Sequence, residues 1–319
     1  MTDCTLTRRS FLRSTASAAL WSASGAPHVL SEPKRRIIST SPDKPFRILQ
    51  ITDIHFFGKE AELNDPLTQA LIDGLVKHFP PDLIAVTGDF WCDNLDDKGL
   101  SCCKQCSLRI DGYGIPWLFA WGNHDEVSDR QKAHEILESM QHTLYSRGDG
   151  NGNYRVELQD EDTKKPLWQF YQLNTEKVGI STRETAWLKQ ECDSLPKTPG
   201  FIFCHIPIFQ YNEIWESGVA QGVKFETVCN EEEKGAALPE IAQTDAVQAM
   251  FVGHDHVNDY SGVHSGVNLV YGRATGFGGY GADRVEKGGT LIELFPDRGT
   301  YSYLSVFPDG RTWKQKREG

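Results

Sequence analysis

Short motifs rich in Asp, His and Asn follow several hydrophobic stretches of this 319-residue chain. Carboxylate, imidazole and amide groups are suitable ligands for Zn, Fe and Mn. In Asp53-x-His55 and His254-x-His256, alternation by two points both side chains the same way on an extended segment. The candidate metal ligands are Asp53, His55, Asp89, Asn123, His205, His254 and His256. Together they have the composition of a site for two transition-metal ions.

Each candidate ligand follows a segment expected to be a β-strand. These strands are residues 46–51, 83–87, 116–121, 200–204 and 249–252. Helices are expected at Asp65–His78 and at Ser128–Met140, the latter with Ser128 as N-cap. This alternation predicts a mainly parallel sheet in the N-terminal half. Because open α/β sheets bind ligands at the carboxyl ends of their strands, we expect the motifs to meet there.

The second half of the chain is less regular. Strands are expected at residues 154–158 and 167–173, a helix at 182–192, and strands that close the sheet at 267–271 and 290–294. Residues 208–240 have no clean period and are predicted to be a long loop, a candidate lid.

Two bridged metal ions would supply hydrolytic chemistry. A shared carboxylate such as Asp89 can bridge two cations about 3.5–4 Å apart. Such a pair lowers the pKa of a bound water, produces hydroxide at neutral pH and clamps phosphoryl oxygens during displacement. His124 directly follows Asn123, and a histidine beside the metals can donate a proton to a leaving oxygen.

The order of the motifs, D-x-H, G-D, G-N-H-D, H-I-P and G-H-D-H, resembles the calcineurin-like metallophosphoesterase superfamily over residues 45–307. Residues 205–207, 253–259 and 276–281 are similar to one branch. That branch holds the yeast dosage-dependent cell-cycle regulator phosphatase and plant probable inactive purple acid phosphatases. The resemblance implies an α/β fold, a β-sandwich of two mixed sheets flanked by helices.

The resemblance also implies roles for the site residues. One ion would be held by Asp53, His55, Asp89 and His256, and the other by Asp89, Asn123, His205 and His254. The ions implied are two divalent or trivalent transition-metal ions, Mn, Fe or Zn. His124 is the implied acid, oriented by Asp125, although Asp125 and Asp255 are also compatible with holding loops through backbone hydrogen bonds. Purple acid phosphatases carry a metal-binding Tyr where this chain has Cys92, and D-x-G where it has Asp53-Ile54-His55, so an Fe(III)–tyrosinate centre is not expected.

The function that the resemblance implies is a dinuclear metal-dependent phosphomonoesterase, with metal-bound hydroxide as nucleophile and a phosphorylated small molecule or phosphoprotein as substrate. The alternatives are a phosphodiesterase of the same fold and a non-catalytic exported binder of phosphorylated ligands. The complete ligand set favours an enzyme. Tyr280, Arg273 and residues 208–240 are candidates for substrate contact, and each has a packing alternative.

Composition and charge exclude other classes. The chain is 39% hydrophobic and 24% charged, an ordinary globular composition, and its net charge is −11. Nucleic-acid binding would need a basic face and is not expected. No apolar stretch is long enough for a stable membrane span. The cluster of Cys102, Cys103 and Cys106 lacks an obvious fourth ligand for zinc, which leaves a disulfide or reduced thiols.

The N-terminus carries a candidate export signal. Thr7–Arg13 contains the pair Arg8-Arg9, followed one residue later by Phe-Leu, and resembles the twin-arginine signal, with a short apolar stretch after it. We expect a signal peptide at residues 1–30, a linker at 31–44 and the metallophosphoesterase domain at 45–319. Cleavage removes three arginines and one aspartate, which changes the net charge from −11 to −13. The chain is thus expected to use the Tat translocase and to be periplasmic or secreted; the alternative is a flexible basic terminus.

Overall fold

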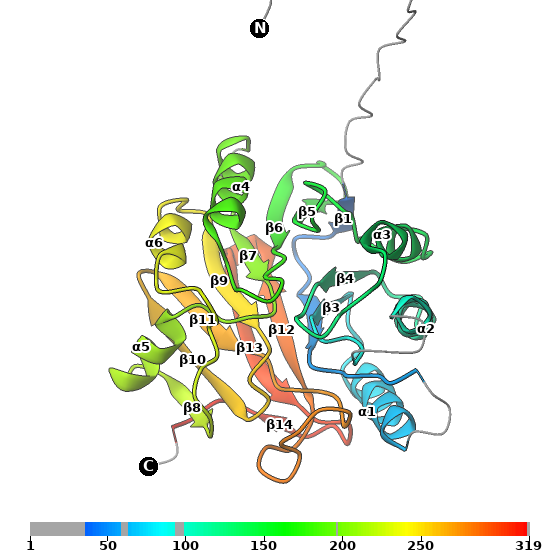
Figure 1. The fold of residues 1–319 in the computed structure, drawn as a ribbon. Coiled ribbons are helices and arrows are strands. Elements are labelled where there is room, and N and C mark those ends of the chain that lie inside the picture. The colour runs from blue at the N-terminus through cyan, green and yellow to red at the C-terminus, as the bar shows by residue number, and fades with distance from the viewer. Residues whose placement is uncertain (1–35, 59–62, 93–98, 196, 318–319) are drawn as a thin grey trace, which may run out of the picture. The chain divides into compact units, whose positions relative to one another are not determined.

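Two mixed β-sheets pack face to face with helices outside them (Figure 1). The computed structural model describes residues 36–58, 63–92, 99–195 and 197–317. Across the interface between the sheets, the rings of Phe46 and Phe170 stack at 6.3 Å, and those of Phe201 and Tyr301 meet edge to face at 4.9 Å. The predicted sandwich of two mixed sheets flanked by helices is confirmed.

The smaller sheet has the strand order β14-β13-β12-β2-β3-β4. Its strands are β2 (Phe46–Ile51), β3 (Leu83–Thr87), β4 (Trp117–Ala120), β12 (Gly289–Phe295), β13 (Thr300–Val306) and β14 (Thr312–Trp313). As predicted, β2, β3 and β4 run parallel. The helices on this side are α1 (Asn64–His78), α2 (Leu100–Asp111) and α3 (Arg130–Glu138), and a 3-10 turn, η1 (Pro296–Arg298), joins β12 to β13.

The larger sheet has the order β1-β5-β6-β7-β9-β11-β10-β8. Its strands are β1 (Arg36–Thr40), β5 (Tyr154–Asp160), β6 (Pro166–Gln172), β7 (Gly200–Phe203), β8 (Gln221–Lys224), β9 (Val247–Val252), β10 (Asn258–His264) and β11 (Val267–Tyr271). The central strands β6, β7, β9 and β11 are parallel. The helices over this sheet are α4 (Thr182–Asp193), α5 (Gln210–Glu216) and α6 (Ala237–Ala242).

Burial on both faces explains the uninterrupted hydrophobic strands of the larger sheet. Along β7, Phe201 and Phe203 belong to the core between the sheets. The alternate residues Ile202 and Cys204 belong to a second core, which also contains buried residues of α4, α5 and α6. Since successive side chains point to opposite faces, a strand covered on both sides must be apolar at every position.

Four predictions about the elements are wrong. Residues 36–40, expected to be linker, form β1 and pair in parallel with β5. Residues 208–240 are not a long loop, because they contain α5, β8 and the start of α6. The strands at 267–271 and 290–294 lie in different sheets, and β12 pairs with β2. The N-cap of α3 is Asp129, whose carboxylate accepts a hydrogen bond from the Lys132 amide at 3.1 Å, and not Ser128.

The predicted signal peptide at residues 1–30 lies outside the described residues. Within the described ranges, no helix combines the length and apolar character needed to cross a bilayer. No two cysteines within these ranges form a disulfide. In α2, the sulfurs of Cys102 and Cys106 are 3.9 Å apart, so this cluster consists of buried reduced thiols.

Candidate metal centre

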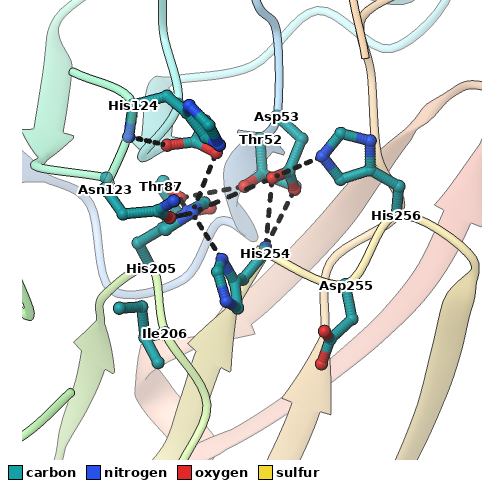
Figure 2. A network of polar contacts seen from close by, with 12 residues as sticks. Thr52, Asp53, Thr87, Asn123, His124, His205, Ile206, His254, Asp255 and His256 are labelled. Carbon is teal, nitrogen blue, oxygen red and sulfur yellow. Dashed lines mark hydrogen bonds and ion pairs between the residues drawn. The ribbon is translucent and has the colours of Figure 1, made fainter. Parts of the chain in front are cut away.

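The predicted ligands meet where the carboxyl ends of strands from both sheets converge (Figure 2). Asp53, Asp89 and Asn123 follow the parallel strands β2, β3 and β4 of the smaller sheet. His205 follows β7, and His254 and His256 follow β9 of the larger sheet. The buried Gln50 joins the two sheets behind the site, since its Nε2 donates to Thr87 Oγ1 at 2.9 Å and to the Val252 carbonyl at 3.1 Å.

One cluster contains Asp53, His55, Asp89 and His256, and all four residues are buried. The Nε2 atom of His55 lies 3.2 Å from Nε2 of His256 and 3.4 Å from Asp89 Oδ2. Nε2 of His256 lies 3.3 Å from Asp53 Oδ1. These donor atoms therefore surround a common point.

A second cluster centres on the fully buried His205. Its Nε2 lies 3.0 Å from Asn123 Oδ1, 3.2 Å from His254 Nδ1 and 3.2 Å from Asp89 Oδ2. Asp89 thus belongs to both clusters through the same oxygen, Oδ2. The sequence pattern placed Asp89 in a bridging position, and the structure places its carboxylate between the two clusters.

The spacing of the donor atoms fits metal ions. Two ligands about 2.1 Å from one ion, at angles of 90–109°, lie about 3.0–3.4 Å apart. Nδ1 of His205 donates to the Thr87 carbonyl at 2.9 Å, so the neutral ring has its lone pair on Nε2, where a metal ion can bind. That lone pair faces acceptor atoms of Asn123 and Asp89. A cation satisfies these converging acceptors, either a metal ion or a proton on Nε2.

The electrostatic field of the site also favours positive charge. Burial lowers the pKa of His205, but Asp89 and Asp53 outweigh burial and raise it to about 10. Burial raises the pKa of Asp53 and Asp89, but the neighbouring histidines bring both well below the ordinary value. Burial lowers the pKa of His55 to about 4, which keeps this imidazole neutral and available as a ligand.

Outer partners orient the imidazoles. Nδ1 of His256 lies 3.3 Å from the Tyr280 carbonyl, which also accepts a hydrogen bond from Lys287 Nζ at 2.7 Å. Nε2 of His254 lies 3.5 Å from Glu231 Oε1. Nδ1 of His55 lies 3.6 Å from Cys92 Sγ. Such partners fix which ring nitrogen faces the metal. Glu231 and Lys287 could not be predicted from the sequence, because neither lies in a motif.

The backbone at the site is unusual. Asp53, His55, Asp89 and His254 have positive φ angles of 51°, 50°, 51° and 80°. Non-glycine residues in this region cluster at functional sites. A Cβ atom at Gly122 would lie 2.2 Å from the Asp89 amide nitrogen and 2.3 Å from Oδ1. The glycine before Asn123 therefore permits the close approach of the β4 loop to the shared carboxylate.

The catalytic candidates differ in environment. His124 is exposed, its amide donates to Asp89 Oδ1 at 2.9 Å, and its ring meets that of His55 edge to face at 5.4 Å. Asp125 is buried, and its carboxylate accepts hydrogen bonds from the amides of Gly122 at 2.7 Å and Phe90 at 2.7 Å. Burial raises the pKa of Asp125 to about 7. These bonds give Asp125 a role in holding the loop that carries His124.

The remaining candidates separate into two groups. Asp255 points away from the cluster (Figure 2), and its carboxylate accepts bonds from Tyr271 and from the Cys229 amide, which gives it a structural role. Arg273 is buried and paired with Asp259 at 2.7 Å, so it is a packing residue and not a substrate contact. By contrast, Tyr280 stacks on His256 at 4.1 Å between ring centroids and is 53% exposed.

The two facing sheets bring Asp and His side chains together at their strand ends. These side chains form two clusters that share one carboxylate, which is the arrangement of a dinuclear metallohydrolase. The chain belongs to the calcineurin-like phosphoesterase family, whose model matches residues 46–258. The predicted resemblance is confirmed. By class, the chain is a phosphoric ester hydrolase.

Similar proteins come from plants and yeast. Probable inactive purple acid phosphatase 14 of Arabidopsis thaliana is 24% identical over an alignment of 333 residues, gaps included. This alignment covers 88% of this chain and 83% of the plant protein. Phosphatase DCR2 of Saccharomyces cerevisiae is 26% identical over an alignment of 273 residues, gaps included, which covers 71% of this chain and 46% of the yeast protein. This chain therefore matches about half of the yeast phosphatase.

Solved structures share the fold. A dimetal phosphatase from Danio rerio has a TM-score of 0.55 at 13% identity, with 83% of this chain and 96% of that chain covered. A purple acid phosphatase from yellow lupin, Lupinus luteus, has a TM-score of 0.54 at 12% identity, with 86% and 54% covered. At these identities the likeness concerns the fold.

Proposed function

We propose that this chain is a dinuclear metal-dependent phosphomonoesterase. The observation that carries the proposal is the pair of ligand clusters that share Asp89, with the exposed His124 beside them. Asp53, His55 and His256 would hold one ion with Asp89, and Asn123, His205 and His254 the other. When bound, two such ions activate a water molecule for attack and neutralise charge on the phosphoryl oxygens. The donor set fits Mn, Fe or Zn.

The chain's own residues supply the proton and the walls of the site. His124, His256 and Tyr280 line a cavity of about 430 Å³. An exposed imidazole beside the shared carboxylate can donate a proton to the leaving oxygen. Tyr280 covers the His256 ring, and its hydroxyl donates to Glu226 at 2.8 Å. The substrate would be a phosphorylated small molecule or an exposed phosphoryl group of a protein, since the net charge of −11 disfavours nucleic acid.

Metal dependence and substrate class are tested together. Purified protein is stripped with a chelator, reloaded with Mn, Fe or Zn, and assayed on monoester and diester pairs that share one leaving group. We expect stripping to abolish hydrolysis and reloading to restore it, with kcat/KM higher for the monoester. A diester preference of tenfold or more, about 1.4 kcal/mol of transition-state discrimination, would establish the phosphodiesterase alternative. Binding of inorganic phosphate without turnover in protein that holds two ions would establish the non-catalytic binder.

We also propose export through the twin-arginine route, which would make the chain periplasmic or secreted. The proposal rests on Thr7–Arg13, which lies outside the described residues. Arg8→Lys combined with Arg9→Lys should leave the precursor in the cytoplasm of the expressing cell, as measured by fractionation and blotting. Arg13→Lys is the matched control and should be exported. Unchanged export of the double variant would exclude the twin-arginine route.

A further inference from the structure

A second and larger cavity, of about 690 Å³, lies beside the metal centre. It is lined by residues 122, 123, 125–128 and 130, which follow β4, and by residues 176–178. Asn123 lines this cavity, while its Oδ1 atom belongs to the His205 cluster. The cavity therefore begins at a residue that would hold a metal ion. Its volume lies within the range of small-molecule sites, about 300–1,000 Å³.

Arg130 supplies an unused cationic group to this cavity. Its guanidinium stacks over the Trp121 ring, 3.6 Å from the centroid. Within the part of the chain that the structure describes, no carboxylate or carbonyl forms an ion pair or hydrogen bond with this guanidinium. Burial lowers the pKa of Arg130, and Tyr145, Glu176 and Asp125 oppose this effect. Its donors are therefore available to a ligand.

The Trp121 ring on which this guanidinium stacks is itself held in place by a hydrogen bond. Trp121 Nε1 donates to the Tyr145 hydroxyl at 2.7 Å, and that hydroxyl is hydrogen-bonded to His134 Nδ1 at 2.7 Å. Trp121, Tyr145 and His134 are all buried. A guanidinium held flat on a fixed ring loses little conformational freedom when it binds an oxyanion through two parallel N–H bonds.

The other charges of the cavity limit what it can accept. Lys177 pairs with Glu126, so these two charges cancel. The carboxyl groups of the exposed Glu176 and the buried Asp125 also line the cavity and offset Arg130, so the cavity has no net excess of positive charge. The lining thus suits a ligand with one anionic group near Arg130 and does not suit a polyanion.

We propose that this cavity receives the leaving group of a small phosphomonoester, and that Arg130 binds a second anionic group on it, a carboxylate or a second phosphate. The proposal rests on the proposed phosphoesterase function and specifies its substrate class. Arg130 would act as a specificity residue, while hydrolysis takes place at the two clusters. A charge-assisted hydrogen bond of this kind contributes about 1.5–3 kcal/mol, which corresponds to about tenfold or more in kcat/KM.

The test compares three esters with the same alkyl chain: phosphooxybutanoate, its primary amide and butanediol bisphosphate. We expect the metal-loaded wild-type protein to prefer at least one anionic ester over the amide by tenfold or more in kcat/KM. Preference for the acid alone indicates a carboxylate ligand, and preference for the bisphosphate alone indicates a phosphate ligand. Arg130→Met should reduce the preference to near unity, and Arg130→Lys should restore part of it. The control Lys197→Met, at a side chain 88% exposed, should keep the full preference.

Two results would overturn the inference: equal kcat/KM for the three esters in the wild type, or an unchanged preference in Arg130→Met. If protein with two bound ions hydrolyses none of the esters, the proposed function fails. The Arg130 site is then tested by calorimetric binding of phosphooxybutanoate and its amide to wild type and Arg130→Met. Equal binding of the acid and the amide by the wild type would overturn the inference independently.

Discussion

Replacing Asp89 with Asn is the most informative perturbation of the metal centre. Asp89 Oδ2 lies 3.4 Å from His55 Nε2 and 3.2 Å from His205 Nε2, so this oxygen faces both clusters. Asn retains an oxygen of similar size but removes the negative charge. Asn also tolerates the positive φ of 51° at this position, which keeps the backbone effect small.

The size of the effect follows from the charge that is lost. Two unit charges 4 Å apart attract by about 4 kcal/mol at an effective dielectric constant of about 20. An ion ligated by Asp89 would be closer and more highly charged, so this is a lower bound. Since 1.4 kcal/mol corresponds to tenfold in affinity, Asp89→Asn should lower the affinity for each of the two ions by about a thousandfold or more. His55→Ala removes a ligand of one cluster and should chiefly weaken one ion.

Metal content after dialysis against a metal buffer, measured by elemental analysis, separates these outcomes. Asp245→Asn is a matched control, because Asp245 also has a positive φ, 54°, but is 72% exposed on the surface. The control should retain two ions, and thermal melts of the metal-free proteins should show that each variant folds. If Asp89→Asn retains two ions with unchanged affinity, or loses only one, the bridging assignment is wrong.

Three further predictions concern single side chains. His124→Ala should keep both ions and lose about 10²–10⁴ in kcat, with a smaller loss for nitrophenyl than for alkyl phosphates; equal losses would argue against proton donation. Glu231→Gln should lower the affinity for one ion about 10–100-fold, because Glu231 Oε1 faces His254 Nε2 at 3.5 Å. Calorimetric titration measures this affinity, which the exposed neighbour variant Glu232→Gln should leave unchanged. Burial, Arg130 and Arg147 lower the pKa of His134 from 6.5 to about 4, so between these values the unfolded chain binds the proton and the folded chain does not. Stability should therefore be full above pH 6.5 and fall as the pH decreases toward 4, and His134→Gln should show a smaller fall in the urea midpoint; parallel curves would contradict this account.

Strands buried on both faces were the predictable part of the fold. Leu83–Thr87 and Gly200–Phe203 are apolar at nearly every position, and the sequence predicts both as strands. Pairing at the edges was harder to predict, because polar residues are tolerated there. The clearest example is β1, whose alternating partial burial gives little hydrophobic signal and whose place in the sheet depends on parallel pairing with β5.

The ligands of the centre were predictable because each stands in a short motif at a strand end. Their supporting groups were not, since the Tyr280 and Thr87 carbonyls act through the backbone. Arg273 was misplaced for a related reason. A sequence cannot show that Asp259 already pairs with its guanidinium. Conversely, Arg130 drew no attention in the sequence, because its importance comes from the ring beneath it and from the lack of a paired acid among the described residues.

If the proposed function is right, the left-handed backbone at four candidate ligands makes the stability of the protein depend on its metal supply. Each such residue costs about 1–3 kcal/mol, against a net stability of about 5–15 kcal/mol for a typical domain. Hydrogen bonds such as that from the His55 amide to the Asp89 carbonyl, at 2.9 Å, oppose this cost. Ions that bind only the folded chain add to its stability in proportion to the logarithm of their concentration. A metal-poor medium would therefore both abolish the proposed hydrolysis and increase the rate of proteolysis.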